Sequence, residues 1–257
     1  LSGCDRNAAT EAATRASEKF GLDIENDLPF FRTLHSYAFN QLGMTKEKMM
    51  GHEDYKEFGQ KCGIPIKTAK YSTEDGTFNS DNEYLTIINT ARVKRMDLLE
   101  YYDSRQNILD IERNTLYLLF EELKKYKKEK GLKDFTDLLE EFIQKESHNK
   151  FKVLFIDEAQ DLSLLQWDMV RKIWDGAEKT YIAGDDDQAI FKWAGADVDH
   201  FIALKEEVDD IQTLNQSYRI PGGPIHELSQ KIIGQVQNRF DKEYKPRTEQ
   251  GVLHRYS

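Results

Sequence analysis

The spacing of apolar residues divides the chain into three stretches. In the first, alanines and one phenylalanine recur at helical spacing and Gly21 follows as a stop signal, which predicts a helix. The members of this repeat are Ala8, Ala9, Ala12, Ala13, Ala16 and Phe20. The segment PFFRTLH then predicts a short extended piece that leads into a second helix beginning near Ser36.

The second stretch, residues 45–133, is predicted to be helical and polar. One apolar helix face is expected beside the charged run KKYKKEKGLK. The residues assigned to that face are Ile108, Ile111, Leu118 and Leu119. Residues 67–83 are rich in Ser, Thr, Asn, Asp and Gly, so they are predicted to form a loop.

The third stretch alternates between predicted strands and predicted helices. KVLFID and TYIAGD are apolar runs that end in acids, and IQTLN is a third strand candidate. Three helices are expected between and after them, marked by Leu165, Met169 and Ile173, by residues 198–204, and by Ile225, Leu228, Ile232 and Val236. This alternation predicts an α/β fold with a parallel sheet covered by helices on both faces. Ligands of such sheets bind at the carboxyl ends of the strands, where the acidic clusters fall.

Composition narrows the setting of the protein. A hydrophobic content of 39% over 257 residues supports a real core. No apolar run approaches twenty residues and no secretory signal opens the chain, so we expect no membrane span and a cytoplasmic, intracellular location. Cys4 and Cys62 lie far apart without metal-ligand spacing, which agrees with a reducing compartment. The net charge of −10 counts mildly against nucleic-acid binding, although a local groove can be basic on an acidic body.

The clearest chemical signal is VLFIDEAQD, residues 153–161. A buried strand delivers Asp157 and Glu158 to the carboxyl edge of the sheet. Nucleotide hydrolysis needs one carboxylate to hold Mg²⁺ and a second to orient or deprotonate the attacking water. The alternative is that both acids cap the next helix or stay solvated, but Gln160 and Asp161, which complete DEAQD, favour the catalytic interpretation.

A second signal is AGDDDQAIFKWAGAD, residues 183–197. Three consecutive aspartates at a strand end are costly unless they are solvated, hydrogen-bonded or near cations. Gln188 is suited to contact a γ-phosphate or its attacking water, because its amide both donates and accepts. Phe191 and Trp193 flank Lys192, a pattern that suits stacking on single-stranded bases. Ordinary core packing is the alternative for these aromatics.

The third signal is LNQSYRIP, residues 214–221, which is predicted to follow a strand and precede a helix. The guanidinium of Arg219 can clamp a phosphate, and Tyr218 offers a ring for adenine stacking. Taken alone, the pair is better explained by a surface ion pair.

The order of TLHSYAF, DFTDLLEEF, VLFIDEAQD, IAGDDDQAIFKWAGAD and LNQSYRIP resembles the UvrD/Rep family of superfamily 1 DNA helicases over most of the chain. The resemblance implies a RecA-like domain of the P-loop NTPase type over residues 1–44 and 134–250. A helical insertion subdomain would occupy residues 45–133, and residues 251–257 would begin a second RecA-like domain. The family implies a bacterial or phage-like ATP-dependent helicase that moves 3′→5′ on single-stranded DNA and unwinds it at a duplex junction.

The resemblance also implies roles for individual residues on the nucleotide side. Asp157 would hold Mg²⁺, and Glu158 would be the general base that activates water. Gln188 would contact the γ-phosphate of ATP, Arg219 would act as an arginine finger, and Tyr218 would stack on adenine.

On the DNA side, three places match the family's motifs. Residues 33–36 resemble its strand-binding motif, namely Thr33, Leu34, His35 and Ser36. Phe191 and Trp193 match aromatics that stack on bases, and Asn7 matches a contact to the DNA backbone. Without the motif, His35 would be read as a structural histidine.

One expected motif is missing from the chain. A P-loop reads GxxxxGK[ST], and none of the 15 glycines is followed by Lys. The family places this loop upstream of the alanine-rich helix, so we expect it to precede Leu1 and expect the chain alone to hydrolyse ATP at no useful rate. Two alternatives stay open at this point: the motor part of a helicase–nuclease, and a non-catalytic DNA-binding module without a P-loop.

Overall fold

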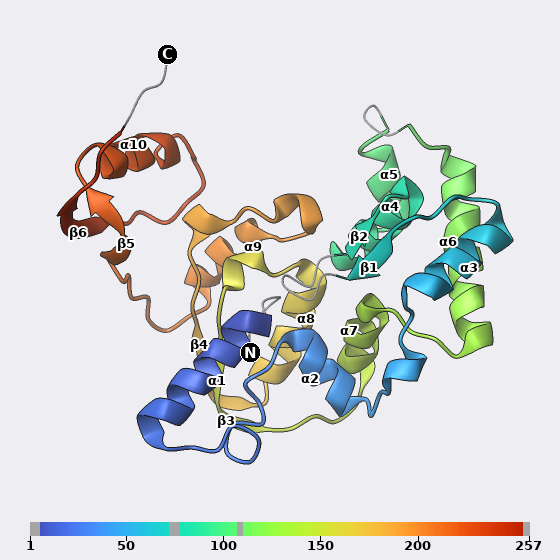
Figure 1. Ribbon diagram of the computed structural model, residues 1–257, viewed down its shortest axis with the longest axis horizontal. Coiled ribbons are helices and arrows are strands. Elements are labelled where there is room, and N and C mark those ends of the chain that lie inside the picture. The colour runs from blue at the N-terminus through green and yellow to red at the C-terminus, as the bar shows by residue number, and fades with distance from the viewer. Residues whose placement is uncertain (1–5, 72–77, 107–109, 254–257) are drawn as a thin grey trace. The chain divides into compact units, whose positions relative to one another are not determined.

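A computed structural model describes residues 6–71, 78–106 and 110–253, and the chain divides into two units. The first unit comprises Leu1–Gly184 and Ile190–Asp197, and the second comprises Asp185–Ala189 and Val198–Ser257. Figure 1 colours the chain from blue at the N-terminus to red at the C-terminus. Among the residues described, no helix is both long enough and apolar enough to cross a membrane.

The first unit holds most of the helices. Its elements are α1 (Arg6–Phe20), α2 (Leu34–Gln41), α3 (His52–Cys62), β1 (Ala69–Tyr71), β2 (Phe78–Ser80), α4 (Glu83–Val93), α5 (Leu98–Asp103), α6 (Arg113–Lys130), α7 (Phe135–Gln144), β3 (Phe151–Ile156), α8 (Leu164–Trp174) and β4 (Ala177–Ile182). Those of the second unit are α9 (Val198–Ala203), β5 (Gln216–Gly222), α10 (Pro224–Ile233) and β6 (Lys245–Gln250).

The first two helices follow the apolar pattern closely. α1 ends as predicted at Gly21, which adopts a φ of +67° and donates its N–H to the carbonyl of Ser17 at 2.8 Å. α2 begins at Leu34, two residues before the predicted start near Ser36. The reason is an N-cap, because the hydroxyl of Thr33 accepts the N–H of Ser36 at 3.2 Å.

Residues 45–133 are helical as predicted, and they build a hydrophobic core of their own from α3, α4, α5 and α6. The stripe of α6 that faces this core is Leu116, Leu119, Leu123 and Tyr126. Leu118 was assigned to the same face, and that assignment is wrong, because its side chain is 63% exposed. Ile111 packs against the core from outside the helix, and Ile108 lies outside the described residues.

The segment predicted as a loop, residues 67–83, contains two short strands. β1 and β2 pair antiparallel, with Ala69 opposite Ser80 and Tyr71 opposite Phe78. The composition of the segment indicated a turn, but strands of three residues are too short to show an alternating pattern. The loop prediction is therefore wrong for both strands, and residues 72–77 lie outside the described part of the chain.

β3, α8 and β4 form a parallel βαβ unit, in which Phe155 lies opposite Tyr181. One face of this strand pair is buried through Leu154 and Ile156, and α8 packs against β4. The other face exposes Val153, Phe155 and Tyr181.

The described residues are thus mixed α/β, with three two-stranded sheets in place of the expected broad parallel sheet with helices on both faces. The helix predicted from Leu165, Met169 and Ile173 is confirmed, with all three side chains fully buried.

The second unit pairs β5 with β6 in parallel and packs α10 against β5. The strand predicted for IQTLN is wrong, because residues 211–215 form no strand and β5 begins at Gln216. β5 is polar in sequence and pairs with a distant segment, so local hydrophobicity did not reveal it. α10 ends at Ile233, before Val236, while the short helix predicted over residues 198–204 is confirmed by α9.

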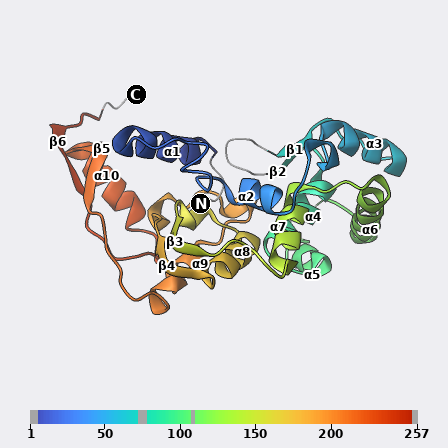
Figure 2. The ribbon, with the colours of Figure 1, turned by 90° about the horizontal axis from the view of Figure 1, so that it is seen from below.

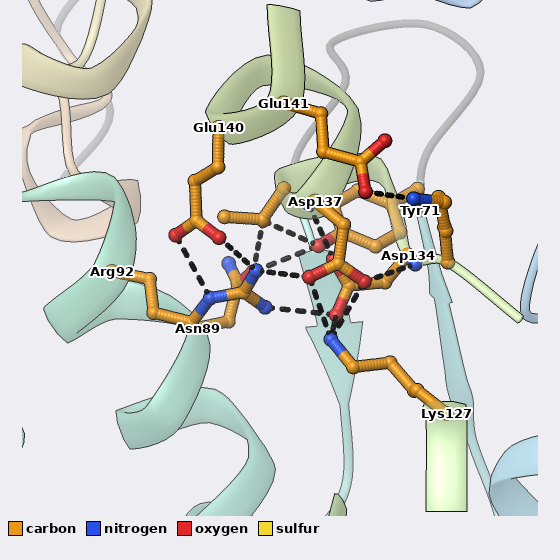
Figure 3. A network of polar contacts seen from close by, with 10 residues as sticks. Tyr71, Asn89, Arg92, Lys127, Asp134, Asp137, Glu140 and Glu141 are labelled. Carbon is orange, nitrogen blue, oxygen red and sulfur yellow. Dashed lines mark hydrogen bonds and ion pairs between the residues drawn. The ribbon is translucent and has the colours of Figure 1, made fainter. Parts of the chain in front are cut away.

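A buried charge network joins α4 and α6 to α7, and Figure 3 shows it from close by. Arg92 donates to Asp134 at 2.8 Å, to Asp137 at 2.6 Å and to Glu140 at 2.8 Å. Lys127 donates to Asp134 at 2.7 Å and to both oxygens of Asp137. The core of residues 45–133 is therefore fastened to the helix that follows it.

The charges of this network are mutually stabilised. Burial alone would raise the pKa of Asp134, but Arg92 and Lys127 hold it well below its usual range. Asp134 and Asp137 also cap α7 reciprocally, each accepting the backbone N–H of the other at 2.8 Å. α7 in turn packs against α2 and α8, and Figure 2 shows α2 beside α7.

We predict that Arg92→Ala lowers the free energy of unfolding by about 3–5 kcal/mol, because it leaves buried carboxylates without their cation. The matched control is Arg113→Ala. Arg113 also donates two hydrogen bonds to a carboxylate, that of Asp103. Its side chain is 46% exposed, however, whereas that of Arg92 is 13% exposed. The control should leave the free energy of unfolding close to that of the wild type, because exposed ion pairs contribute little to stability. Urea unfolding measures both, and equal losses would contradict the role given to burial.

Candidate functional site

Asp157 and Glu158 lie in the turn directly after β3. The end of β4 holds this turn in place, since Ala183 donates its N–H to the carbonyl of Ile156 at 2.8 Å and accepts that of Ala159 at 3.0 Å. Both acids are exposed at the carboxyl end of the strand pair, as predicted. Glu158 adopts a φ of +54° and a ψ of +43°, a left-handed conformation that costs a non-glycine residue about 1 kcal/mol or more.

The carboxylate of Glu158 is held from the protein side by a buried amide. Gln160 is 1% exposed, and its Nε2 donates to Oε2 of Glu158 at 2.8 Å. The same nitrogen lies 3.4 Å from Oδ2 of Asp161. An amide nitrogen can only donate, so Gln160 fixes the orientation of an exposed carboxylate without competing for a proton.

Asp161 lies half-buried on the other side of this amide. Burial and the charge of Glu158 raise the pKa of Asp161 to about 6. Its Oδ1 is buried and has no hydrogen-bond partner among the residues that the structure describes. The DEAQD motif thus provides one partly buried ionisable group, Asp161, in addition to the two exposed acids in the turn, Asp157 and Glu158.

The aromatic loop that follows in sequence, residues 190–197, is tied to the same segment. Asp197 donates its N–H to the carbonyl of Leu162 at 2.9 Å, and Ala196 forms an isolated bridge with Ser163. The ring centroids of Phe191 and Trp193 lie 6.4 Å apart. Trp193 is 65% exposed, so the alternative of ordinary core packing does not describe it.

Residues 33–36 form the start of α2, and their side chains play different parts. Thr33 caps the helix and Leu34 is fully buried, so the side chain of Leu34 serves the core. The ring of His35 meets that of Phe135 edge-on at 5.8 Å. Burial lowers the pKa of His35 to about 4, against a smaller opposing effect of the charge on Asp134. His35 is therefore neutral at physiological pH.

A small cavity of about 40 Å³ brings several of these residues together. His35, Asp161 and Phe191 line it, along with Tyr71 and Thr136. The start of α2, the DEAQD segment and the aromatic loop thus meet around one space within the first unit. Asn7 lies in α1, but its side chain is outside what the structure describes.

In the second unit, the run of three aspartates is neutralised from residues 239–244. Arg239 grips Asp187 with two hydrogen bonds, at 2.8 and 2.6 Å. Lys242 pairs with Asp185 at 2.5 Å and with Asp186. From the sequence, these acids were expected to need solvent, hydrogen bonds or nearby cations. The second unit itself provides both hydrogen bonds and cations.

Gln188 ends the short 3₁₀ turn that carries two of these acids, Asp186–Gln188, and its Nε2 donates to Oδ2 of Asp185 at 2.6 Å. Tyr218 and Arg219 lie on β5, within the strand where a strand end had been predicted. Both are exposed, Tyr218 by 82%. An exposed ring and an exposed guanidinium are open to a ligand, and they belong to a different element from Gln188.

The residues present fit a magnesium ion bound together with phosphates. Among the described residues no cluster of three or more His, Cys, Asp or Glu forms a metal cage. Mg²⁺ does not require one, because it keeps several waters and is held by one or two carboxylates plus substrate phosphates. Asp157, an exposed carboxylate at a strand end, meets that requirement.

Two groups of residues were given no role from the sequence. Gln160 was counted as part of DEAQD, but only the structure shows that its amide reaches Glu158. Arg239, Lys242 and Tyr244 lie more than fifty residues after the acids they contact, in a segment without a motif. The three adjacent aspartates were the only hint, since nearby cations were one of the three conditions under which such a run is tolerated.

The strand that leads to Asp157 and Glu158 was predicted to be buried, but β3 is buried on one face only and exposes Val153 and Phe155 on the other.

The model of the UvrD/REP helicase N-terminal domain matches residues 5–209. The chain belongs to this family, and the resemblance drawn from its motifs is confirmed.

Curated relatives carry helicase names. The chain is 30% identical over 120 residues to the ATP-dependent DNA helicase Rep of Escherichia coli K12, covering 42% of this chain and 18% of that protein. It is 23% identical over 268 residues to a probable DNA helicase II homolog of Mycoplasma pneumoniae, covering 96% and 36%. It is 28% identical over 101 residues to the ATP-dependent DNA helicase PcrA of Staphylococcus epidermidis, covering 38% and 13%. The matched region is thus about a third or less of each relative.

We predict that His35 makes the protein less stable in mild acid. The unfolded chain takes up a proton near pH 6.5 but the folded chain only near pH 4, so stability falls as the pH drops through that interval. Between pH 7.5 and 5 the loss attributable to His35 should be about 2 kcal/mol. Urea unfolding of the wild type and His35→Asn at both pH values measures the difference. An NMR titration of the His35 ring with a midpoint near 6.5 would refute it.

Proposed function

We propose that the gene product carrying this chain is an ATP-driven DNA helicase, and that the chain is part of its RecA-like front motor domain. The observation that carries this proposal is the cavity lined by His35, Asp161 and Phe191. There the segment that bears the hydrolytic carboxylates adjoins both segments suited to single-stranded DNA. The names of the relatives, which are ATP-dependent DNA helicases, support the same function.

On the nucleotide side, the proposed roles follow the chemistry of the side chains. Asp157 would hold Mg²⁺, which neutralises phosphate charge when it is bound with ATP. Glu158, oriented by Gln160, would take the proton of the attacking water. Gln188 would contact the γ-phosphate or that water, Arg219 would stabilise the developing charge, and the exposed ring of Tyr218 would stack on adenine.

On the DNA side, the exposed ring of Trp193 would stack on a base, with Phe191 beside it and Lys192 near the phosphates. Thr33, His35 and Ser36 would form the neighbouring part of the strand-binding surface. Because its side chain is buried, Leu34 would contribute through its backbone. Asn7 would contact the DNA backbone.

Further parts of the proposal rest on family membership. The motor would travel 3′→5′ on single-stranded DNA, open the duplex at a junction, and work inside the cell. The domain limits predicted from the sequence, residues 1–44 with 134–250, residues 45–133 and residues 251–257, are retained. The chain contains no Gly-Lys pair, so we expect ATP hydrolysis only in the full gene product.

The first test concerns hydrolysis. In the full gene product, Glu158→Gln should lower the kcat of DNA-stimulated ATP hydrolysis by at least about 100-fold, because the variant cannot accept a proton. Its affinity for single-stranded DNA should not change. The matched control is Glu178→Gln, which alters an exposed carboxylate on β4 and should keep full activity. DNA-stimulated hydrolysis that survives Glu158→Gln would exclude this residue as the base, and a gene product without any such activity would favour a non-catalytic DNA-binding module.

The second test concerns DNA and can be made on the chain itself. We expect weak binding of a fluorescent single-stranded oligonucleotide, falling as salt rises. Trp193→Ala should weaken it at least about fivefold, since stacking on one base contributes about 1–3 kcal/mol. Tyr117→Ala is the control, because Tyr117 is an exposed aromatic on α6 outside the proposed surface. Equal affinities for wild type and Trp193→Ala would remove the stacking role.

A further inference from the structure

The segment 239–244 makes a concentrated set of contacts to the turn that carries Gln188. Arg239 holds Asp187, and the backbone N–H of Phe240 donates to Asp186 at 2.8 Å. Lys242 and the hydroxyl of Tyr244 both reach Asp185. These contacts bridge more than fifty residues of sequence and lie wholly within the second unit. The segment also lies beyond residue 209, where the match to the family model ends.

The contacts are largely buried, and two cations, Arg239 and Lys242, face the three aspartates. The side chains of Lys242 and Asp186 are 8% and 2% exposed. Burial alone would lower the pKa of Lys242, but hydrogen bonds to Asp185 and Asp186 raise it above its usual value. Burial and the hydrogen bond to Asp185 raise the pKa of Tyr244 to about 12. Lys242 is therefore charged and Tyr244 is a neutral donor at physiological pH.

Asp185 is the point on which these contacts converge. Its Oδ1 accepts Lys242 at 2.5 Å, and its Oδ2 accepts both the hydroxyl of Tyr244 and Nε2 of Gln188. Two donors from residues 239–244 thus fix the same carboxylate that binds the amide of Gln188. The hydrogen bond from Nε2 of Gln188 to Oδ2 of Asp185 at 2.6 Å restrains this exposed side chain and so limits the directions in which its Oε1 can point.

We propose that Lys242 and Tyr244 are positioning residues for Gln188, acting through Asp185. This inference rests on the proposed role of Gln188 at the γ-phosphate or its attacking water. A glutamine that contacts the γ-phosphate or orients the attacking water must present its amide in a defined direction when ATP is bound. Lys242 and Tyr244 restrain the amide of Gln188 through Asp185, and they belong to a segment that carries none of the recognised motifs.

The distribution of contacts separates this role from simple tethering. Arg239 and the backbone of Phe240 already bind the segment to Asp187 and Asp186. Attachment of the segment alone would not require a donor to Oδ2 of Asp185, the oxygen that also accepts Nε2 of Gln188. The hydroxyl of Tyr244 lies at that oxygen, so its removal should change the orientation of Gln188 more than the attachment of the segment.

The experiment measures DNA-stimulated ATP hydrolysis of the full gene product. Tyr244→Phe should lower kcat about tenfold and leave the KM for ATP and the affinity for single-stranded DNA within about twofold of wild type. The matched control is Tyr102→Phe, which also removes one hydroxyl hydrogen bond, that to the carbonyl of Ile111 at 2.7 Å. The control should keep the wild-type kcat.

A double-mutant cycle with Gln188→Ala decides whether Tyr244 acts through Gln188. If it does, adding Tyr244→Phe to Gln188→Ala lowers kcat no further. Independent, multiplicative losses of kcat in the two variants would overturn the proposal. The proposal would also be overturned if Tyr244→Phe kept a normal kcat while Gln188→Ala was impaired. In that case the proposed helicase function would still stand. A normal kcat in Gln188→Ala would instead overturn the proposed role of Gln188, on which the inference rests.

Folding defects are separated from positioning by a second variant. Thermal unfolding is compared for Tyr244→Phe and Tyr102→Phe. Should Tyr244→Phe unfold at a markedly lower temperature, Lys242→Arg takes its place in the cycle, because it keeps the charge but replaces the compact ammonium with a larger planar guanidinium and so alters the geometry at Asp185. The same non-additivity with Gln188→Ala is then expected, and additivity again overturns the proposal.

Discussion

The buried ion network around Arg92 is the interaction on which the first unit depends. It joins a core that residues 45–133 build for themselves to α7, and α7 packs against both α2 and α8. α2 carries His35, and α8 follows directly after DEAQD. Because buried charges tolerate little change in geometry, the network sets the distance between the helical stretch and the elements that position the site.

The second unit also contains acidic side chains that are stabilised by residues distant in the chain. Three consecutive aspartates would repel one another if they were left together, and a cation or a tyrosine from residues 239–244 meets each of them. In the first unit buried charge connects the core of residues 45–133 to the helix α7, whereas here it fixes a short turn. In both units the buried carboxylates of these clusters are paired with cations inside the fold.

Sequence patterns correctly predicted the features that depend on interactions between residues close together in the chain. The helix of residues 6–20, its glycine stop and the strand that ends at Ile156 follow from spacing alone, and DEAQD and GDDDQ marked the acids and Gln188. The errors arose where a distant partner decides the structure. β5 is a strand because it pairs with β6, and Leu118 is exposed because the core lies on the other side of α6. Lys242 and Tyr244 could not be found without the fold, since no spacing links them to Asp185.

The left-handed backbone of Glu158 has a consequence for how this protein can change. Glycine or asparagine would occupy that conformation at lower cost, so under the role proposed for Glu158 stability and activity favour different residues at this position. Selection for thermal robustness alone would remove the glutamate. A glutamate that persists there in long-diverged copies of this chain would therefore record continued selection for hydrolysis, whereas drift to glycine would date its loss.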